Sequence, residues 1–251
     1  MSGESITLIA LVILAGIGFI SALISTFLEG HKFMTRAWWS DWLQGISTEM
    51  AGAIVTAILL GLVVGIVQER EAEGALQEQL IREMGGPDNG FSIRAVRELR
   101  ARDWLTDGTL EGANLENANL EDAPLYGSSM EDVILTGADL EDANLTNAVL
   151  SGADLRNATL IEANLQFSNL QNATLRRTDL ERAQLFGCDL TGANLVAADL
   201  TDTLLNDSTI LPDGSNWSPD VDMARFTSSS HPDFWRSTDP DSPAYEEPES
   251  G

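Results

Sequence analysis

Oxygen-bearing side chains recur at a regular spacing between residues 105 and 210, and they are the first candidates for chemistry. An Asp or Asn stands directly before many of the leucines there, for example Asn114, Asp139 and Asp154. Carboxylate and amide oxygens are ligands for calcium, but a calcium site needs roughly six to eight oxygens that converge on one point. One such side chain in every five residues indicates a structural role instead. We therefore predict no metal site, no cofactor and no catalytic residue.

The cysteine and histidine content also argues against a metal site. Cys188 is the only cysteine, and His31 and His231 stand far apart in the sequence. Neither a disulfide within the chain nor a thiol or histidine metal site is predicted from so few residues. Cys188 falls in a position that small residues otherwise occupy, so we predict that it is buried as a small side chain.

The charge of the chain excludes one class of function. The formal net charge is −25, and the 14 basic residues include one lysine, Lys32. A nucleic-acid binder needs an excess of cations to neutralise phosphates, so nucleic acid is excluded as a partner. The acidity leaves three interpretations open: solubility, adaptation to a salty cell interior, or mimicry of a polyanion.

A five-residue repeat accounts for the central part of the chain. Every fifth residue from Leu105 to Ile210 is Leu, except Met130 and Ile210 itself, which gives 20 leucines in 22 positions. From position 110 onward, a small residue stands two residues before each of these positions, and it is Ala in 13 of 21 cases. The side chains that repeat are therefore a large apolar residue and a small partner.

A period of five residues fits neither an α-helix nor a β-strand. In a helix it spreads the leucines around the cylinder, and in a strand it sends successive leucines to opposite faces. A chain that turns by about 90° every five residues instead points every leucine inward. Four quintets then close a coil of 20 residues, and successive coils stack at about 4.8 Å.

The runs GANLENANLEDAPL, TGADLEDANLTNAVLSGADLRNATL and TGANLVAADL follow the pattern A(D/N)LXX. In this pattern the chain resembles the pentapeptide-repeat family. The resemblance implies a right-handed quadrilateral β-helix over about two fifths of the chain, and it implies no catalytic residues. Some family members mimic DNA and bind topoisomerases, so it also implies a role in binding.

Residues 20 apart stack on the same side of such a coil, so the sides can be assigned from the sequence. The side formed by 118–122 and its equivalents in later coils carries ten carboxylates and one arginine. These residues are Glu121, Asp122, Asp139, Glu141, Asp142, Glu162, Asp179, Glu181, Asp199, Asp202 and Arg182. We call this the acidic side; it is either a solvated surface or a docking surface for a basic partner.

The next side, formed by 123–127 and its equivalents, carries three aromatic residues: Tyr126, Phe167 and Phe186. We call this the aromatic side. Its aromatic residues are either scattered apolar groups of an ordinary surface or the anchors of a flat protein interface.

Two apolar runs near the N-terminus predict membrane-spanning helices over residues 5–28 and 50–67. About 20 helical residues cross a hydrocarbon core of roughly 30 Å. Small residues recur at every fourth position of the second run: Ala53, Ala57, Gly61 and Gly65. Such a ridge lets another helix approach closely, either the first run or a second copy of the chain in a homo-oligomer.

The orientation of these two runs in the membrane is predicted from the tryptophans between them and from the lone cysteine. Residues 29–45 connect them and carry Trp38, Trp39 and Trp42, a residue type that favours the membrane surface. Two spans place both ends of the chain on one side of the membrane, and the lone cysteine favours the cytoplasm. We therefore predict a two-pass membrane protein with a cytoplasmic repeat domain.

The composition divides the chain into five parts. Helix-forming residues follow the second run as far as Gly85, Gly86 and Pro87, and the last forty residues hold most of the prolines. We predict a membrane anchor over 1–67, a helical connector and N-terminal cap over 68–104, the β-helix over 105–210, a C-terminal cap over 211–235, and a disordered acidic tail over 236–251.

The sequence predicts a protein that binds rather than catalyses, with two hypotheses for what it binds. The first is a membrane-anchored scaffold for an unidentified protein partner. The second is a polyanion mimic that sequesters a basic or nucleic-acid-binding protein at the membrane.

Overall fold

The computed structural model describes the backbone of residues 36–245 and the side chains of residues 56–245. Three helices are described: α2 (Arg36–Met84), α3 (Asn89–Ala101) and α4 (Ala224–Thr227). The chain divides into two compact units, Met1–Glu69 and Arg70–Gly251. The predicted connection over 29–45 is thus wrong from Arg36 onward, because these residues already belong to α2.

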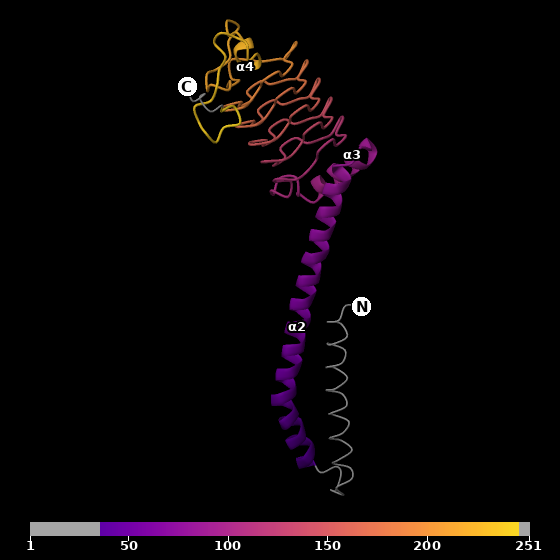
Figure 1. Ribbon diagram of the computed structural model, residues 1–251. Helices are drawn as coiled ribbons and strands as arrows, with labels where there is room; N and C mark the ends of the chain where they lie inside the picture. The colour runs from indigo at the N-terminus through magenta and orange to yellow at the C-terminus, as the bar shows by residue number, and fades with distance from the viewer. Residues whose placement is uncertain (1–35, 246–251) are drawn as a thin grey trace. The chain divides into compact units, whose positions relative to one another are not determined.

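Residues 105–210 form a β-helix whose coils stack along one axis (Figure 1). Parallel bridges join residues 20 apart, from Asn114 with Ile134 to Gln184 with Leu204. A spacing of 20 residues means four quintets per coil, as the five-residue period predicted. Within this described stretch the backbone contains no α-helix, and its β-bridges are isolated rather than joined into long strands.

Each quintet has the same local conformation, and it explains why Asp and Asn precede leucine. The residue before the inward leucine makes the β-bridge to the next coil, and the two residues after the leucine form a turn. The side chain of the bridging Asp or Asn accepts a hydrogen bond from the first turn residue, as in Glu141 N–H to Asp139 Oδ1 (3.1 Å). The second turn residue has a positive φ, for example Asn147 at 56° and Asp142 at 56°. The regular Asp and Asn residues are therefore part of the turn.

The core is a column of leucines lined by small side chains. Leu120, Leu140 and Leu160 are fully buried, as is Ala143 in the small position. Cys188 occupies this small position as predicted and lies 3.3 Å from Ser168 Oγ. Burial raises the pKa of the Cys188 thiol to about 12, so the thiol is inert at neutral pH.

The register slips by one residue at the end of the coil, where the sequence predicted none. Asp189 bridges to Ile210, which is 21 residues away. Thr209 and Leu211 are buried, whereas Ile210 is only partly buried. Leu211 therefore takes the inward position that the repeat assigned to Ile210. One extra residue enters between Leu205 and Thr209.

The two ends of the coil are covered. Leu80 and Met84 of α2 and Leu99 of α3 are buried at the first end, where Asn119 N–H donates to Gly86 O (3.0 Å). At the second end Phe226 of α4 is buried. Covered ends hide the unpaired backbone groups that would otherwise pair with another chain.

The predicted disorder of 236–251 is wrong for residues 237–245, which lie against the coil as a strap. Asn194 Nδ2 donates to Pro243 O (2.7 Å), and Ser242 Oγ donates to Gly192 O (2.9 Å). Ser237 bridges to Tyr245. Because these hydrogen bonds use partners about 50 residues away, local composition could not predict them. Residues 246–251 lie outside the described residues.

The prediction of a two-pass membrane protein is corrected by the helices. Among the residues that the structure describes, no helix carries an apolar stretch long enough to cross a membrane. The described side chains of α2 are uncharged from Thr56 to Val67, and Glu69 and Arg70 follow. The predicted span over 50–67 lies within α2 and is corrected by this finding. The predicted span over 5–28 lies outside the described residues.

Candidate interaction surfaces

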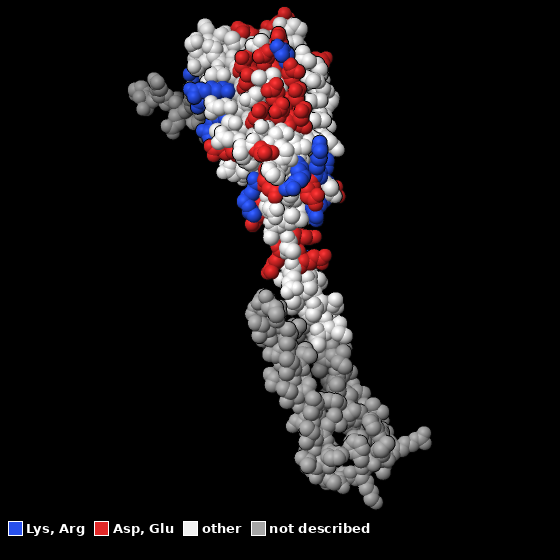
Figure 2. Space-filling view, turned by 90° about the vertical axis from the view of Figure 1, so that its right-hand side faces the viewer, with Lys and Arg blue, Asp and Glu red and all other residues white. Residues whose placement is uncertain are grey.

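The coil stacks the residues of the acidic side above one another. Bridges join Asn119, Asp139, Thr159, Asp179 and Asp199 in succession, so the quintets that contain them form one continuous side. The carboxylates assigned to this side therefore lie on one surface of the repeat. Figure 2 shows Asp and Glu side chains gathered in a band over the coil.

The carboxylates of this side affect one another. Partial burial raises the pKa of the Glu141 carboxyl, and the charges of Asp139, Glu121, Asp142 and Glu162 raise it further. Partial burial and the neighbouring like charges therefore make ionisation of Glu141 less favourable in the folded protein than in the unfolded chain. At the other end of the side, Arg182 forms ion pairs with Glu162 (2.9 Å) and Glu181 (2.8 Å). The negative charge is thus least compensated around Glu141.

We expect Glu141→Gln to increase the free energy of unfolding at neutral pH. A carboxyl whose pKa is raised by folding adds stability below its unfolded pKa, and this stability is lost as the pH rises through the folded pKa. The increase should therefore shrink as the pH falls from neutral towards the ordinary glutamate pKa of about 4.3, because the wild-type carboxyl then becomes neutral as well. Urea denaturation at several pH values measures the difference.

The matched control is Glu131→Gln, at the same turn position on another side of the coil. An increase for Glu141→Gln that is the same at every pH, or that Glu131→Gln reproduces, would contradict this explanation.

The three aromatic residues of the aromatic side do not form one cluster. Phe167 is 60% exposed and Tyr126 is 48% exposed, whereas Phe186 is partly buried. The guanidinium of Arg100 lies 3.6 Å from the centre of the Tyr126 ring, so Tyr126 takes part in the contact with α3. A Cβ on Gly187 would lie 2.7 Å from the ring of Phe167, so this ring rests on Gly187. Phe167 and Phe186 thus share one area, and Tyr126 belongs to another.

Comparison with known proteins identifies the repeat. A family model for pentapeptide repeats matches in eight copies, over residues 105–137, 138–177 and 168–207. A pentapeptide repeat protein from the thylakoid lumen of Arabidopsis thaliana is 32% identical to this chain over 37% of this chain and 68% of that one, with a TM-score of 0.29. The chain belongs to the pentapeptide-repeat family.

Two further pentapeptide-repeat structures are similar. HetL of Nostoc sp. strain PCC 7120, which is involved in heterocyst differentiation regulation, is 32% identical over 43% of this chain, with a TM-score of 0.32. The match covers 61% of the HetL chain. QnrB1, a plasmid-mediated fluoroquinolone resistance protein, is 17% identical over 42% of this chain and 65% of that one, with a TM-score of 0.30. Comparison with curated protein sequences gives no match.

The pentapeptide-repeat coil also has a side with arginines, which the sequence reasoning did not single out. The quintets 153–157 and 173–177 stack on each other and carry Arg156, Arg176 and Arg177. Arg156 pairs with Asp154 (Nε to Oδ1, 2.8 Å), and this contact lowers the pKa of the Asp154 carboxyl. Counting the charged residues separately for each side of the coil, with the same spacing of 20, identifies these three arginines.

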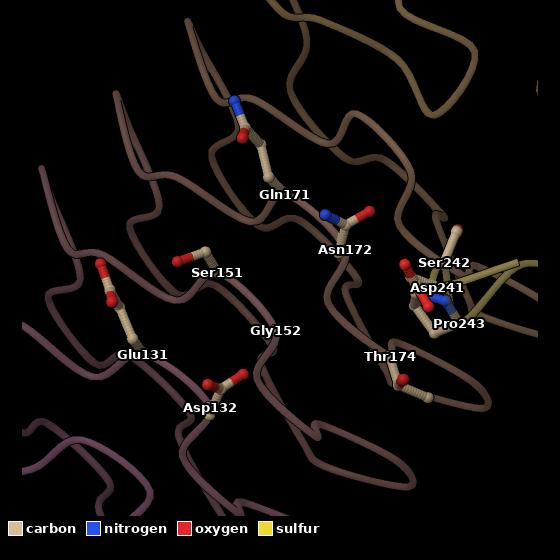
Figure 3. A pocket seen from close by; sticks show the side chains of 10 residues that line it. All are labelled: Glu131, Asp132, Ser151, Gly152, Gln171, Asn172, Thr174, Asp241, Ser242 and Pro243. Carbon is tan, nitrogen blue, oxygen red and sulfur yellow. The ribbon is translucent and has the colours of Figure 1, made fainter. Parts of the chain in front are cut away.

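A groove of about 490 Å³ runs between the coil and the strap (Figure 3). Turn residues of three successive coils, including Asp132 and Asn172, line one rim, and Asp241, Ser242 and Pro243 lie at the other. Among the described residues, no group of three or more His, Cys, Asp or Glu side chains has an arrangement that could hold a metal ion. The groove is polar, and Asp132 and Asn172 at its coil rim belong to turns that the repeat itself requires.

Proposed function

We propose that this pentapeptide-repeat protein is a non-catalytic scaffold that binds a basic protein on its acidic side. The observation that carries the proposal is the concentration of ten carboxylates and one arginine on a single side of the coil. A partner with positive charge at the same spacing would neutralise a surface whose own charges repel one another.

The rigidity of the coil supports this role. Backbone hydrogen bonds fix each quintet to the equivalent quintet of the next coil, as in Leu140 N–H to Thr159 O (2.8 Å) and Asp142 N–H to Ile161 O (3.0 Å). The backbone positions of the carboxylates are therefore set before binding, so little conformational entropy is lost when a partner docks. The aromatic side, with Phe167 and Phe186, is a second candidate surface, and it would contribute apolar contacts that do not depend on salt.

A scaffold fits the arrangement better than an enzyme does. Catalysis needs polar groups that converge in a concave, water-restricted site. The acidic and aromatic residues project from successive quintets along flat sides, while the centre of the coil is filled by leucines such as Leu140 and Leu160.

A second candidate function is mimicry of a polyanion, in which the partner is a protein whose basic site normally binds nucleic acid. The regular stacking of carboxylates favours it, because coils repeat at about 4.8 Å and give the charges a constant spacing along one axis. Mimicry makes one further requirement: nucleic acid and the repeat coil must compete for the same site on the partner.

The test is charge reversal on the acidic side of the full chain. We expect Glu121→Arg, Glu141→Arg and Glu181→Arg together to leave the fold intact and to abolish a salt-sensitive interaction recovered by crosslinking. The matched control reverses Glu111, Glu116 and Glu131, which are turn residues on other sides of the coil and give the same change in net charge. Equal loss of binding in both triple variants would contradict the proposal.

Two further arms of this experiment separate the alternatives. Phe167→Ala with Phe186→Ala should weaken only an interaction that salt does not affect, which would assign it to the aromatic side. Adding duplex DNA to the crosslinking reaction should displace the partner if the coil mimics a polyanion, and should leave a partner of the plain scaffold in place.

A further inference from the structure

The strap lies against one corner of the coil and shows how an extended segment binds there. This corner, which we call the strap corner, is formed by the turns at 131–132, 151–152, 171–172 and 191–192. Ser242 Oγ donates to Gly192 O (2.9 Å), and Asn194 Nδ2 donates to Pro243 O (2.7 Å). A segment that brings a hydroxyl to the outward carbonyl of a turn glycine is therefore held at this corner.

The repeat places an equivalent site two coils away, at Gly152. Bridges between residues 20 apart put Gly152 and Gly192 on the same corner, and their φ values of 70° and 73° give the two turns the same shape. At both glycines an added Cβ would clash with an Asp or Asn of the preceding coil. Gly152 O therefore points outward as Gly192 O does, yet it accepts no hydrogen bond from any described residue. The kind of acceptor that the strap uses in one coil is free in another.

The groove lies over this free acceptor, between the coil and the strap (Figure 3). Its volume of about 490 Å³ is within the range of roughly 300 to 1,000 Å³ that ligand sites have. The side chains of Ser151, Asn172 and Thr174 line it and make no hydrogen bond within the described part of the chain. These groups and Gly152 O are donors and acceptors that remain available to a ligand.

The charge of the groove favours a cationic ligand. Its lining contains three carboxylates and no cationic side chain, and these carboxylates are Glu131, Asp132 and Asp241. None of the three forms an ion pair with a described residue. They do not converge as metal ligands do, so the negative charge is spread along the groove. A chain that carries several positive charges matches it better than a single ion does.

We propose that the groove binds an extended, basic peptide segment of a partner protein, which lies beside the strap on the same corner. A hydroxyl side chain of this segment donates to Gly152 O, as the strap's serine does two coils away. Basic side chains of the segment meet Asp132 and Asp241, and its backbone bonds with Asn172 and Thr174. The strap corner is not part of the acidic side, so this site does not rest on the function proposed above.

Binding of a labelled peptide to the full chain tests the proposal. The probe is the strap sequence 237–245 with Asp239→Lys and Asp241→Lys in the peptide, which keeps the serine hydroxyl and adds positive charge. Fluorescence anisotropy should show saturable binding, and the unaltered strap sequence should bind at least about tenfold more weakly because its carboxylates meet those of the groove. Absence of saturable binding by the lysine-bearing probe would overturn the proposal.

Isosteric variants of the full chain locate the bound probe. Asp132→Asn with Asp241→Asn should raise the dissociation constant of the probe at least about fivefold. The matched control is Asp122→Asn with Asp142→Asn, which gives the same change in net charge at turns of the acidic side. Equal weakening by the two double variants would show that the probe follows net charge and not the groove, and would contradict the proposal.

A second pair of variants tests the hydrogen bonds of the groove. Thr174→Val removes a hydroxyl from the lining and should weaken the probe about threefold. Thr159→Val is the control, because Thr159 has the same position before an inward leucine but lies on the acidic side. The same loss of affinity in both variants, or in neither, would show that the groove does not bond with the probe.

Two further measurements distinguish this occupant from others. Ser242→Ala removes the hydrogen bond from the strap to Gly192 O, and it should weaken the probe because the groove loses its second wall. Tighter binding to this variant would show that the probe takes the place of the strap, which would overturn the proposal. Displacement of the probe by an equal concentration of the triamine spermidine would also overturn it, because positive charge alone would then account for binding.

Discussion

Leu155→Asp should unfold the repeat coil or destabilise it by about 3 to 5 kcal/mol. Leu155 is fully buried, and its N–H donates to Thr174 O of the next coil (2.8 Å). A carboxylate at this position would lie among stacked leucines with no partner to neutralise it. Because every coil packs on its neighbours, the loss should spread through the whole stack. Far-ultraviolet circular dichroism during thermal and urea denaturation measures the change.

The same substitution at Leu204 is the matched control. Leu204 precedes an inward position and is 46% exposed, and Asp occupies the equivalent position in other quintets, such as Asp179 and Asp199. Leu204→Asp should therefore change the stability by less than about 0.5 kcal/mol. Equal destabilisation by the two variants would show that the leucine column is not what holds the coil together.

Arg100→Met should destabilise the first end of the coil by about 2 to 4 kcal/mol. The Arg100 guanidinium donates to Pro124 O (2.8 Å) and Tyr126 O (2.7 Å), and it lies over the Tyr126 ring. Methionine keeps much of the apolar stem but removes both hydrogen bonds and the cation–π contact. Amide hydrogen exchange should then be faster in the first coil and little changed near the second end.

Arg97→Met on the same helix is the control for Arg100→Met. Arg97 is exposed, so its replacement should change the stability by less than about 0.5 kcal/mol. If the two arginine variants exchange at the same rate in the first coil, Arg100 does not secure α3 to it.

The period of five residues predicted most of the fold because each quintet satisfies its own requirements locally. A large residue such as Leu120 and a small one such as Ala118 are both buried, as their positions in the repeat require. The end of α2 at Met84, before two glycines and a proline, was predicted from local signals as well. The assignment of residues to sides followed from the same period.

The five-residue period fails in the last coil, where a side-chain oxygen takes the place of a backbone carbonyl as hydrogen-bond acceptor. Leu205 and Ile210 are five residues apart and both apolar, so the sequence gives no sign of a slip. In the structure Asn206 Oδ1 accepts the hydrogen bond from Gly187 N–H (3.1 Å), a contact that backbone carbonyls make in other coils. Thr209 Oγ1 then donates to Leu185 O (2.8 Å). Hydrogen bonds with the neighbouring coil, and not the local sequence, therefore determine which residue points into the core.

The candidate surfaces were predictable in position but not in exposure. The spacing of 20 placed the carboxylates on one side, yet the contact of Tyr126 with Arg100 depends on how α3 covers the first coil. The partial burial of Phe186 was equally hidden, because a side chain at a turn can lie along the surface or away from it. Arg176 and Arg177 could have been assigned by the same spacing, which places them on the side that carries Arg156.

Contacts at a constant separation of 20 residues also determine which changes in length the repeat tolerates. Inserting or deleting 20 residues would add or remove one whole coil and leave every later residue on its original side. A change of five residues would preserve the leucine column but turn all later quintets by a quarter of a coil, so that the carboxylates on either side of the change would no longer align. Duplications within the gene can therefore either lengthen a binding surface or break it up, while the core remains equally well packed.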